Sequence, residues 1–216
     1  MSDNDTFASI RKEYERGTLD ERSVNRDPIA QFRSWFEDAT KSSEVEPNAC
    51  ALATVGPHGA PSLRMVLLKS LDERGFAFFT NYESRKGRDL ARTSVAALLF
   101  YWASLERQVR IEGEIEIVSA AESDAYFASR PRNAQLGALI SKQSEVVPSR
   151  KVLDESYAKA VQAAGESPLV RPSNWGGYRL IPSYFEFWQG RESRLHDRVR
   201  YTKGGGREWA IARLWP

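Results

Sequence analysis

The sequence predicts an α+β protein built around an antiparallel β-barrel, and three observations support this fold class. Many short segments alternate apolar and polar residues or form buried-looking apolar runs. Turn sequences such as Gly56-Pro-His-Gly59 and Asp72-Glu-Arg-Gly75 join several of them directly. Helical patterns lie near the N-terminus and in the middle of the chain rather than between successive strands, which argues against a doubly wound parallel sheet.

The strand-like segments are bounded by these turns and by glycine or proline. In residues 107–118, Val109 and Ile111 alternate with Arg110 and Glu112, so one face of that strand should be buried and the other wet. We expect strands over residues 49–55, 62–71, 76–80, 95–102, 107–118, 178–181, 184–189, 196–202 and 208–214.

The expected helices begin at recognisable caps. Asp27 followed by Pro28 is typical of an N-cap and first helical residue, and Ser119 with Glu122 forms a capping-box pattern. We expect helices over residues 7–16, 28–42, 85–92 (capped by Ser84), 119–129, 134–140 and 149–164. The domain expectation is an N-terminal segment over residues 1–26 that acts as a lid, followed by one domain over residues 27–216.

Composition excludes several classes of function. The 216 residues carry a formal charge of only +2, which gives no global case for nucleic-acid binding. One cysteine and two histidines argue against a metal site. No run of 18 apolar residues and no signal-peptide pattern occurs, so we expect a cytoplasmic protein with no membrane partner.

The most informative segment is Glu186–Arg198, where an aromatic strand runs into a cluster of cations. Arg194, His196 and Arg198 alternate, and in an extended chain they would share one face. Since neighbouring positive groups repel one another, this pattern favours a site for an electron-rich ligand.

Three other segments indicate anion or heterocycle binding. Arg64 and Lys69 lie on one strand, and their spacing puts them on opposite faces unless a bulge intervenes; an edge strand blunted by charges is the alternative. Arg85 and Lys86 lie in the first turn of a helix, where a bound phosphate would offset the unfavourable dipole; an ordinary solvated pair is the alternative.

The third segment holds Tyr126 and Arg130, four residues apart on a helix, which can clamp an anion together. The alternative is an arginine favoured by the helix C-terminus. The amides of Gln108 and Gln143, the latter next to Ser144, can read the edge of a heterocycle.

Taken together and in this order, the clusters resemble the pyridoxamine 5′-phosphate oxidase family over almost the whole chain. The motifs that carry the resemblance are Arg64-Met-Val-Leu-Leu-Lys69, Thr80-Asn-Tyr-Glu-Ser-Arg-Lys86, Leu105-Glu-Arg-Gln-Val109, Ser129-Arg-Pro-Arg132, Ser141-Lys-Gln-Ser144, Trp175-Gly-Gly-Tyr178 and Phe187-Trp-Gln-Gly190 followed by Arg194-Leu-His-Asp-Arg198. The resemblance implies a split-barrel fold and a homodimer with FMN at its interface. It also implies oxidation of pyridoxamine 5′-phosphate and pyridoxine 5′-phosphate by O2 to pyridoxal 5′-phosphate, with release of H2O2 and, from the amine, NH3.

The resemblance also implies roles for individual residues. Those implied to bind the cofactor are Arg64, Met65, Val66, Leu67, Leu68, Lys69, Phe79, Thr80, Arg85, Lys86, Gln108, Gln143, Ser144, Trp188 and Arg198, with Gln143 and Ser144 coming from the other subunit. Those implied to bind the substrate are Lys69, Tyr126 and Arg130 at its phosphate, Arg194 and His196 at its ring, and Arg11 with Tyr14 as a lid. Arg194 and His196 are the implied catalytic residues.

One position departs from the family pattern. A serine commonly follows the phosphate-binding arginine by four residues, and here that position is Ala134, with Asn133 as a possible substitute donor. Two alternatives remain open: a related split-barrel flavin oxidase with another substrate, such as a phenazine precursor, and a non-catalytic protein that binds FMN or pyridoxal phosphate.

Overall fold

The computed structural model describes residues 9, 13–205 and 208–216, and the chain divides into two compact units. Unit 1 comprises residues 1–48, 99–111 and 183–216, and unit 2 comprises residues 49–98 and 112–182. Three long strands contribute residues to both units: β5 (Val95–Trp102), β6 (Arg107–Ile117) and β7 (Trp175–Gln189). Each unit is therefore described by itself below.

One antiparallel sheet with flanking helices provides the framework, in agreement with the predicted fold class. Its strand order is β2-β1-β5-β6-β7-β4-β3, and β8 pairs with both β7 and β9. The remaining strands are β1 (Ala49–Val55), β2 (Pro61–Leu67), β3 (Ser70–Leu71), β4 (Phe76–Asn81), β8 (Asp197–Lys203) and β9 (Trp209–Leu214).

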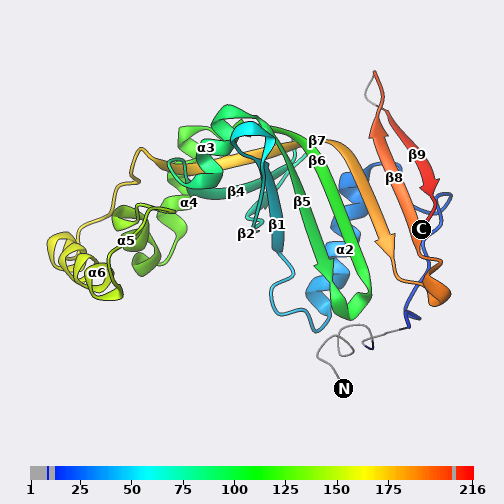
Figure 1. Cartoon of the computed structure of the whole chain (residues 1–216), viewed down its shortest axis with the longest axis horizontal. Coiled ribbons are helices and arrows are strands. Elements are labelled where there is room, and N and C mark those ends of the chain that lie inside the picture. Colours follow the sequence, from blue (N-terminus) through cyan, green and yellow to red (C-terminus); the bar gives the residue numbers. More distant parts are fainter. Residues whose placement is uncertain (1–8, 10–12, 206–207) are drawn as a thin grey trace. The chain divides into compact units, whose positions relative to one another are not determined.

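In unit 2, β1 pairs antiparallel with β2, and β4 pairs with the first half of β7. The helices of this unit are α3 (Arg85–Arg92), α4 (Ala120–Ser129), α5 (Arg132–Ile140) and α6 (Arg150–Ala164). Serine side chains cap three of them: Ser84, Ser119 and Ser149 each accept the backbone N–H of the residue three positions later. The caps at Ser84 and Ser119 were predicted, whereas the cap at Ser149 was not. Figure 1 shows α5 and α6 side by side.

In unit 1, α2 (Pro28–Lys41) packs its apolar stripe onto aromatic residues of the strands. Asp27 caps the helix by accepting the Ile29 N–H at 3.0 Å, as predicted. Phe32 is fully buried against Phe100 and Trp102, and Trp35 meets Phe187 edge to face. The β8–β9 hairpin lies beside the second half of β7 (Figure 1). Burial of these aromatic rings supplies much of the apolar core of unit 1.

Several predicted elements differ from the structure. The strand expected over residues 62–71 is interrupted at Leu68 and Lys69, and the segments 178–181 and 184–189 join into the single strand β7. Helix α5 begins at Arg132 rather than at residue 134. Residues 13–16 are not helical, and the rest of the helix predicted over residues 7–16, apart from Ser9, lies outside the described residues.

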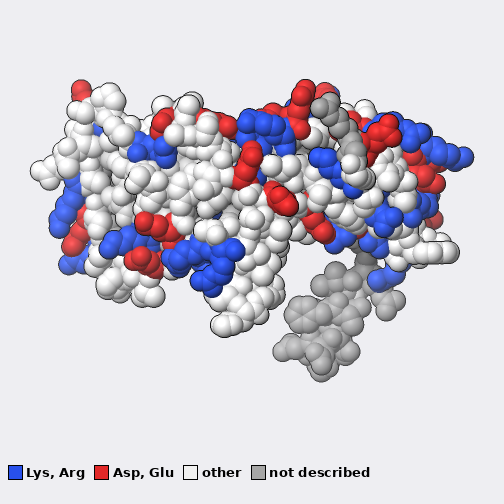
Figure 2. Space-filling model, turned by 90° about the horizontal axis from the view of Figure 1, so that it is seen from above, with Lys and Arg blue, Asp and Glu red and all other residues white. Residues whose placement is uncertain are grey.

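The charged side chains are interspersed over the face drawn in Figure 2, in keeping with the formal charge of +2. Ligand binding therefore has to be explained by local clusters rather than by a field of one sign. Among the helices that the structure describes, none is long and apolar enough to cross a membrane.

Candidate functional site

A cluster of three cations lies in unit 2 at the start of α3, and we call Arg64, Arg85 and Lys86 the cation cluster. Burial, together with the charge of Arg64, lowers the pKa of Lys86 from 10.5 to about 8. The pKa of Arg64 is also lowered, mainly by burial and in part by Arg85, although Asp89 opposes the shift. Arg64 therefore lies close enough to Arg85 and Lys86 for their charges to act on one another.

The guanidinium of Arg64 is held in place by hydrogen bonds to residues of β1 and β2. Its Nη1 donates to the Thr54 hydroxyl at 2.7 Å and to the Leu52 carbonyl at 3.1 Å, and its Nη2 donates to the Ser62 hydroxyl at 2.6 Å. Thr54 in turn donates to buried Asp89, which lies 3.7 Å from Arg64 Nη2. Thr54 and Asp89 were not predicted, because partners from another strand and helix leave no local pattern in the sequence.

Lys86 is 9% exposed, and the partners of its ammonium group are neutral. Nζ donates to Thr80 Oγ1 at 3.0 Å and to Gln143 Oε1 at 2.9 Å, and it lies 3.5 Å from Ser84 Oγ. Thr80 also donates to Gln143 at 2.9 Å. A buried ammonium group with only dipolar partners is costly, and a bound anion would offset that cost. The cluster therefore fits the phosphate of a nucleotide cofactor such as FMN.

Gln143 contacts this cluster within its own chain, through Lys86 and Thr80. The neighbouring Ser144 is exposed and has a left-handed backbone with φ of 76°. Of the residues predicted to line the flavin, Met65 is 64% exposed on β2, Val66 and Leu67 are half-buried, and Leu68 is buried.

A second cationic position lies at an open pocket of ≈ 300 Å³ in unit 2. Arg130 lines this pocket together with Ala134, Gln143 and Trp175. Its guanidinium lies 4.6 Å from the centre of the Trp175 ring, and its Nη1 is buried without a hydrogen-bond partner among the described residues. Burial lowers the pKa of Arg130. An unpaired, desolvated guanidinium nitrogen is what an incoming phosphate oxygen would satisfy.

Aromatic rings form the wall behind Arg130. Tyr126 stacks on Phe79 with ring centres 4.0 Å apart and on Trp175 at 6.1 Å. Burial raises the pKa of Tyr126, and the charge of Arg130 partly opposes this shift. Tyr126 and Arg130 both pack on Trp175, but they do not share a helix face as predicted, because Arg130 is the extended C-cap residue after α4. Lys69 is exposed at the break between β2 and β3, where its N–H donates to the Ala77 carbonyl at 2.9 Å.

A third group, in unit 1, surrounds Trp188 at the end of β7. The His196 ring lies 4.7 Å from Trp188, and Tyr14 meets both rings edge to face at 5.6 Å. His196 Nδ1 accepts the Arg191 N–H at 3.1 Å, so a neutral ring carries its proton on Nε2. Burial and the charge of Arg194 lower the pKa of His196. The predicted Arg11 lies outside the described residues, and Gln108 is half-buried on β6.

The prediction that Arg194, His196 and Arg198 alternate along an extended chain is wrong for Arg194. Arg194 lies in a 3-10 turn and has a φ of 60°, because the chain reverses direction between β7 and β8. Arg198 is on β8, directly opposite Trp188. Its Nε donates to Glu186 at 2.8 Å, and the buried Glu186 was not predicted.

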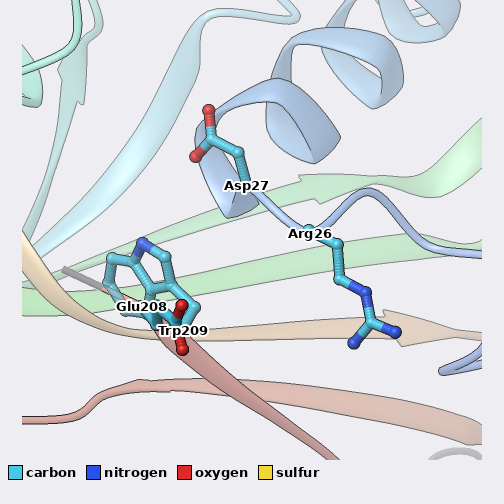
Figure 3. A pocket seen from close by; sticks show the side chains of 4 residues that line it. All are labelled: Arg26, Asp27, Glu208 and Trp209. Carbon is cyan, nitrogen blue, oxygen red and sulfur yellow. The ribbon is translucent and has the colours of Figure 1, made fainter. Parts of the chain in front are cut away.

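A larger pocket in unit 1, of ≈ 520 Å³, shares no residue with these groups. Arg26, Asp27, Glu208 and Trp209 line it. Figure 3 shows Arg26 and Asp27 pointing in different directions from the start of α2. Because its polar groups do not converge on one point, this pocket lacks the features of a specific ligand site.

Comparison with known proteins defines the class first. The structure resembles that of PhzG from Burkholderia lata in complex with tetrahydrophenazine-1-carboxylic acid, with a TM-score of 0.88, 31% identity and coverage of 95% of this chain and 100% of the other. It also shares its fold with an FMN-binding protein from Nostoc punctiforme related to pyridoxamine 5′-phosphate oxidase, with a TM-score of 0.73, 18% identity and coverage of 89% and 100%. The chain thus has the split-barrel fold of these proteins.

Sequence comparison defines the family. The family model described as pyridoxamine 5′-phosphate oxidase matches residues 36–161, and that of the pyridoxine 5′-phosphate oxidase C-terminal dimerisation region matches residues 175–216. The pyridoxine/pyridoxamine 5′-phosphate oxidase of Burkholderia lata is 56% identical over 213 residues, with coverage of 98% of this chain and 99% of the other. That of Trichormus variabilis is 54% identical over 211 residues, with coverage of 98% and 99%. The chain belongs to the pyridoxamine 5′-phosphate oxidase family, and its cofactor is FMN.

Proposed function

We propose that this protein oxidises pyridoxamine 5′-phosphate and pyridoxine 5′-phosphate to pyridoxal 5′-phosphate with O2, releasing H2O2 and, from the amine, NH3. The observation that carries the proposal is the unpaired Nη1 of Arg130 in a pocket distinct from the cation cluster. Two anion positions in one unit suit two phosphates, one from the cofactor and one from the substrate. Gln143 borders both, since it lines the pocket and bonds to Lys86.

In this proposal, Arg64, Arg85 and Lys86 hold the FMN phosphate, and residues 65–68, Phe79 and Thr80 line the flavin. Bound FMN supplies the chemistry of accepting a hydride and passing electrons to O2. Tyr126 and Arg130, with Lys69, hold the substrate phosphate, so the substrate is fixed at one end while its ring reacts.

The proposal assigns the ring of the substrate to the unit 1 group. His196, held through Nδ1 by Arg191, presents an Nε2–H donor to a ring substituent. Arg194 carries a guanidinium group, which is a poor proton acceptor, so its proposed role is to stabilise negative charge. Trp188, Arg198 and Gln108 are assigned to the flavin ring, with Ser144 and Gln143 as further polar contacts. A homodimer with FMN at its interface is part of the proposal, supported by the match of residues 175–216 to a dimerisation region.

A second candidate is an oxidase of a reduced phenazine, which the 31% identity to PhzG favours. The ligand in that structure, tetrahydrophenazine-1-carboxylic acid, carries a carboxylate but no phosphate. A phenazine substrate would leave the proposed phosphate-binding pocket at Arg130 without a dianionic ligand. For this reason we prefer the vitamin B6 phosphates as the proposed substrates.

The test compares substrates on the purified, FMN-loaded protein in air. We expect kcat/KM for pyridoxine 5′-phosphate to exceed that for unphosphorylated pyridoxine at least about 100-fold, because charge-assisted hydrogen bonds to the phosphate are lost. Arg130→Gln should remove most of this preference, whereas Arg132→Gln should keep it, since Arg132 is exposed and donates to carbonyls of residues 165 and 167. Equal rates with and without the phosphate, or oxidation of the tetrahydrophenazine alone, would overturn the proposal.

A further inference from the structure

A short segment of unit 1, residues 13–19, lies across the end of β7 and is called the strap here. It has no regular secondary structure. Its Tyr14 ring packs on Trp188 and His196, and a Cβ atom at Gly190 would come within 2.7 Å of Tyr14 Cγ. Only a residue without a side chain at position 190 lets the tyrosine ring lie this close to the backbone of the chain.

The strap is fixed by the carboxylate of Glu106, a residue of the Leu105–Val109 motif for which no role was predicted from the sequence. Glu106 is 2% exposed, and its Oε2 accepts the backbone N–H groups of Glu15 at 2.9 Å and Arg16 at 3.1 Å. Those two residues directly follow Tyr14. A buried carboxylate needs strong donors, and two backbone amides on one oxygen meet that need while fixing the path of the strap.

The turn that carries Glu106 is itself held against β7. Glu106 has a left-handed φ of 56°, and its carbonyl accepts the Gly190 N–H at 2.8 Å and the Gln189 side chain at 3.2 Å. Farther along the strap, Asp197 accepts the Leu19 N–H at 3.0 Å. The Glu106 turn therefore connects the strap to the backbone beside Trp188, and a change at Glu106 is transmitted directly to Tyr14.

We propose that Glu106 is a positioning residue that holds the strap so that Tyr14 covers the Trp188–His196 pair. It fixes the substrate side of the site without touching the substrate, and it does not contribute to FMN binding. The identity of the substrate in this inference rests on the proposed function, but the position of the strap does not.

The direct test is amide hydrogen exchange of Glu15 and Arg16 in the FMN-loaded protein. In Glu106→Gln one neutral oxygen replaces the carboxylate, and in Glu106→Ala the acceptor is absent. We expect exchange at both amides to speed up about tenfold in the glutamine variant and more in the alanine variant, because hydrogen bonds to charged groups are the stronger ones. Glu44→Gln is the matched control: Glu44 accepts the Ser104 N–H of the same turn at 2.6 Å but makes no bond to the strap. Unchanged protection in both Glu106 variants would overturn the proposal.

Kinetics test the consequence of that position. For Glu106→Gln we expect a KM for pyridoxine 5′-phosphate about three- to tenfold higher with kcat within about twofold, because substrate binding loses part of a preformed wall. Gly190→Ala should raise KM similarly while Glu15 and Arg16 stay protected, because it displaces Tyr14 and leaves the Glu106 bonds in place. An unchanged KM in both variants would contradict the role of Tyr14. If no vitamin B6 phosphate is oxidised at all, the proposed function fails, and the exchange rates still decide whether Glu106 holds the strap.

Discussion

The ammonium group of Lys86 lies 2.9 Å from Oε1 of Gln143, so a buried cation of α3 is bonded to an amide that follows α5. Its other hydrogen-bond acceptors are the hydroxyls of Thr80 and Ser84. The lysine is thus surrounded by dipoles rather than by a carboxylate, and its burial is unfavourable for the protein without its cofactor.

Lys86→Met should weaken FMN binding and stabilise the apoprotein at neutral pH. The pKa of Lys86 is lowered from 10.5 to about 8, so the unfolded chain binds more protons between these values and the stability of the fold rises with pH across that window. Below pH 8 the full penalty applies, at most about 3 kcal/mol. Denaturant unfolding of the apoprotein from pH 7 to 10.5 should show this rise in the native protein and lose it in Lys86→Met. Lys142→Met, at an exposed lysine, is the control; a rise that persists in Lys86→Met would refute the assignment.

Ala134→Ser should tighten substrate binding. Ala134 lines the pocket beside Arg130, and the Asn133 side chain is turned onto the backbone, where its Oδ1 accepts the Ala134 N–H at 2.8 Å. A new hydroxyl would add one donor to a charged phosphate, which corresponds to roughly 1.5–3 kcal/mol at most. We expect a lower KM for pyridoxine 5′-phosphate and no change for the unphosphorylated alcohol. If both KM values fall together, the added hydroxyl does not act on the phosphate.

The activity should decline at acid pH through His196. Its pKa lies below the ordinary value of 6.5, because burial and Arg194 disfavour the charged ring, and protonation of Nδ1 would break the bond from the Arg191 N–H. A base whose pKa is lower in the folded than in the unfolded protein favours the fold when it is neutral. This contribution to stability is lost as the pH falls from the unfolded-state pKa to the folded-state pKa. We expect kcat/KM to fall below pH 6.5. His196→Asn, whose amide oxygen can accept the same N–H, should be less active and lack this limb; an unaltered acid limb in that variant would assign it to another group.

Arg179→Met should destabilise unit 2 without changing the cofactor site. Arg179 is 1% exposed and lies 2.6 Å from Glu122, 3.3 Å from Asp72 and 3.4 Å from Glu116. Removal of this cation leaves three partly exposed carboxylates, two of which can still pair with Arg74, and we expect a loss of about 1–3 kcal/mol. Thermal unfolding measures the loss. Arg150→Met, at an exposed helix pair with Asp154, should change stability by less than about 0.5 kcal/mol, and a similarly small effect at Arg179 would contradict the network.

Local signals in the sequence predicted most of the secondary structure. The predicted caps at Asp27, Ser84 and Ser119 mark helix starts, because a cap needs only one side chain and a nearby N–H. In a complete capping box the Glu122 carboxylate would accept the backbone N–H of Ser119, but here this carboxylate pairs with Arg179. The bounds of β1, α3 and β5 agree with the predicted ranges.

Partners distant in the sequence were not predictable from it. Glu106 accepts N–H groups 91 and 90 residues away, and Asp89 accepts from a threonine 35 residues away. Neither leaves a periodic or spaced pattern, because a single long-range contact has no local repeat. The cationic candidates could be selected from the sequence, because clusters of positive charge are visible there. The roles of Asp89 beside Arg64 and of Glu106 at the strap could not be predicted in this way.

The conformation of Arg194 shows the same limit within a short segment. An alternation of charged residues predicted an extended chain, but two successive left-handed residues, Ser193 and Arg194, form a turn there. Neither is glycine, so the usual sequence signal for positive φ is missing. Similarly, the break at Leu68 and Lys69 carries no glycine or proline to mark it.

The central claim is tested most directly by the products that the purified, FMN-loaded protein forms from pyridoxine 5′-phosphate in air. We predict that pyridoxal 5′-phosphate, followed by its absorbance, and H2O2 appear in equal amounts, with one O2 consumed for each. Formation of neither product from pyridoxine 5′-phosphate or pyridoxamine 5′-phosphate by a protein that carries its flavin would contradict the account.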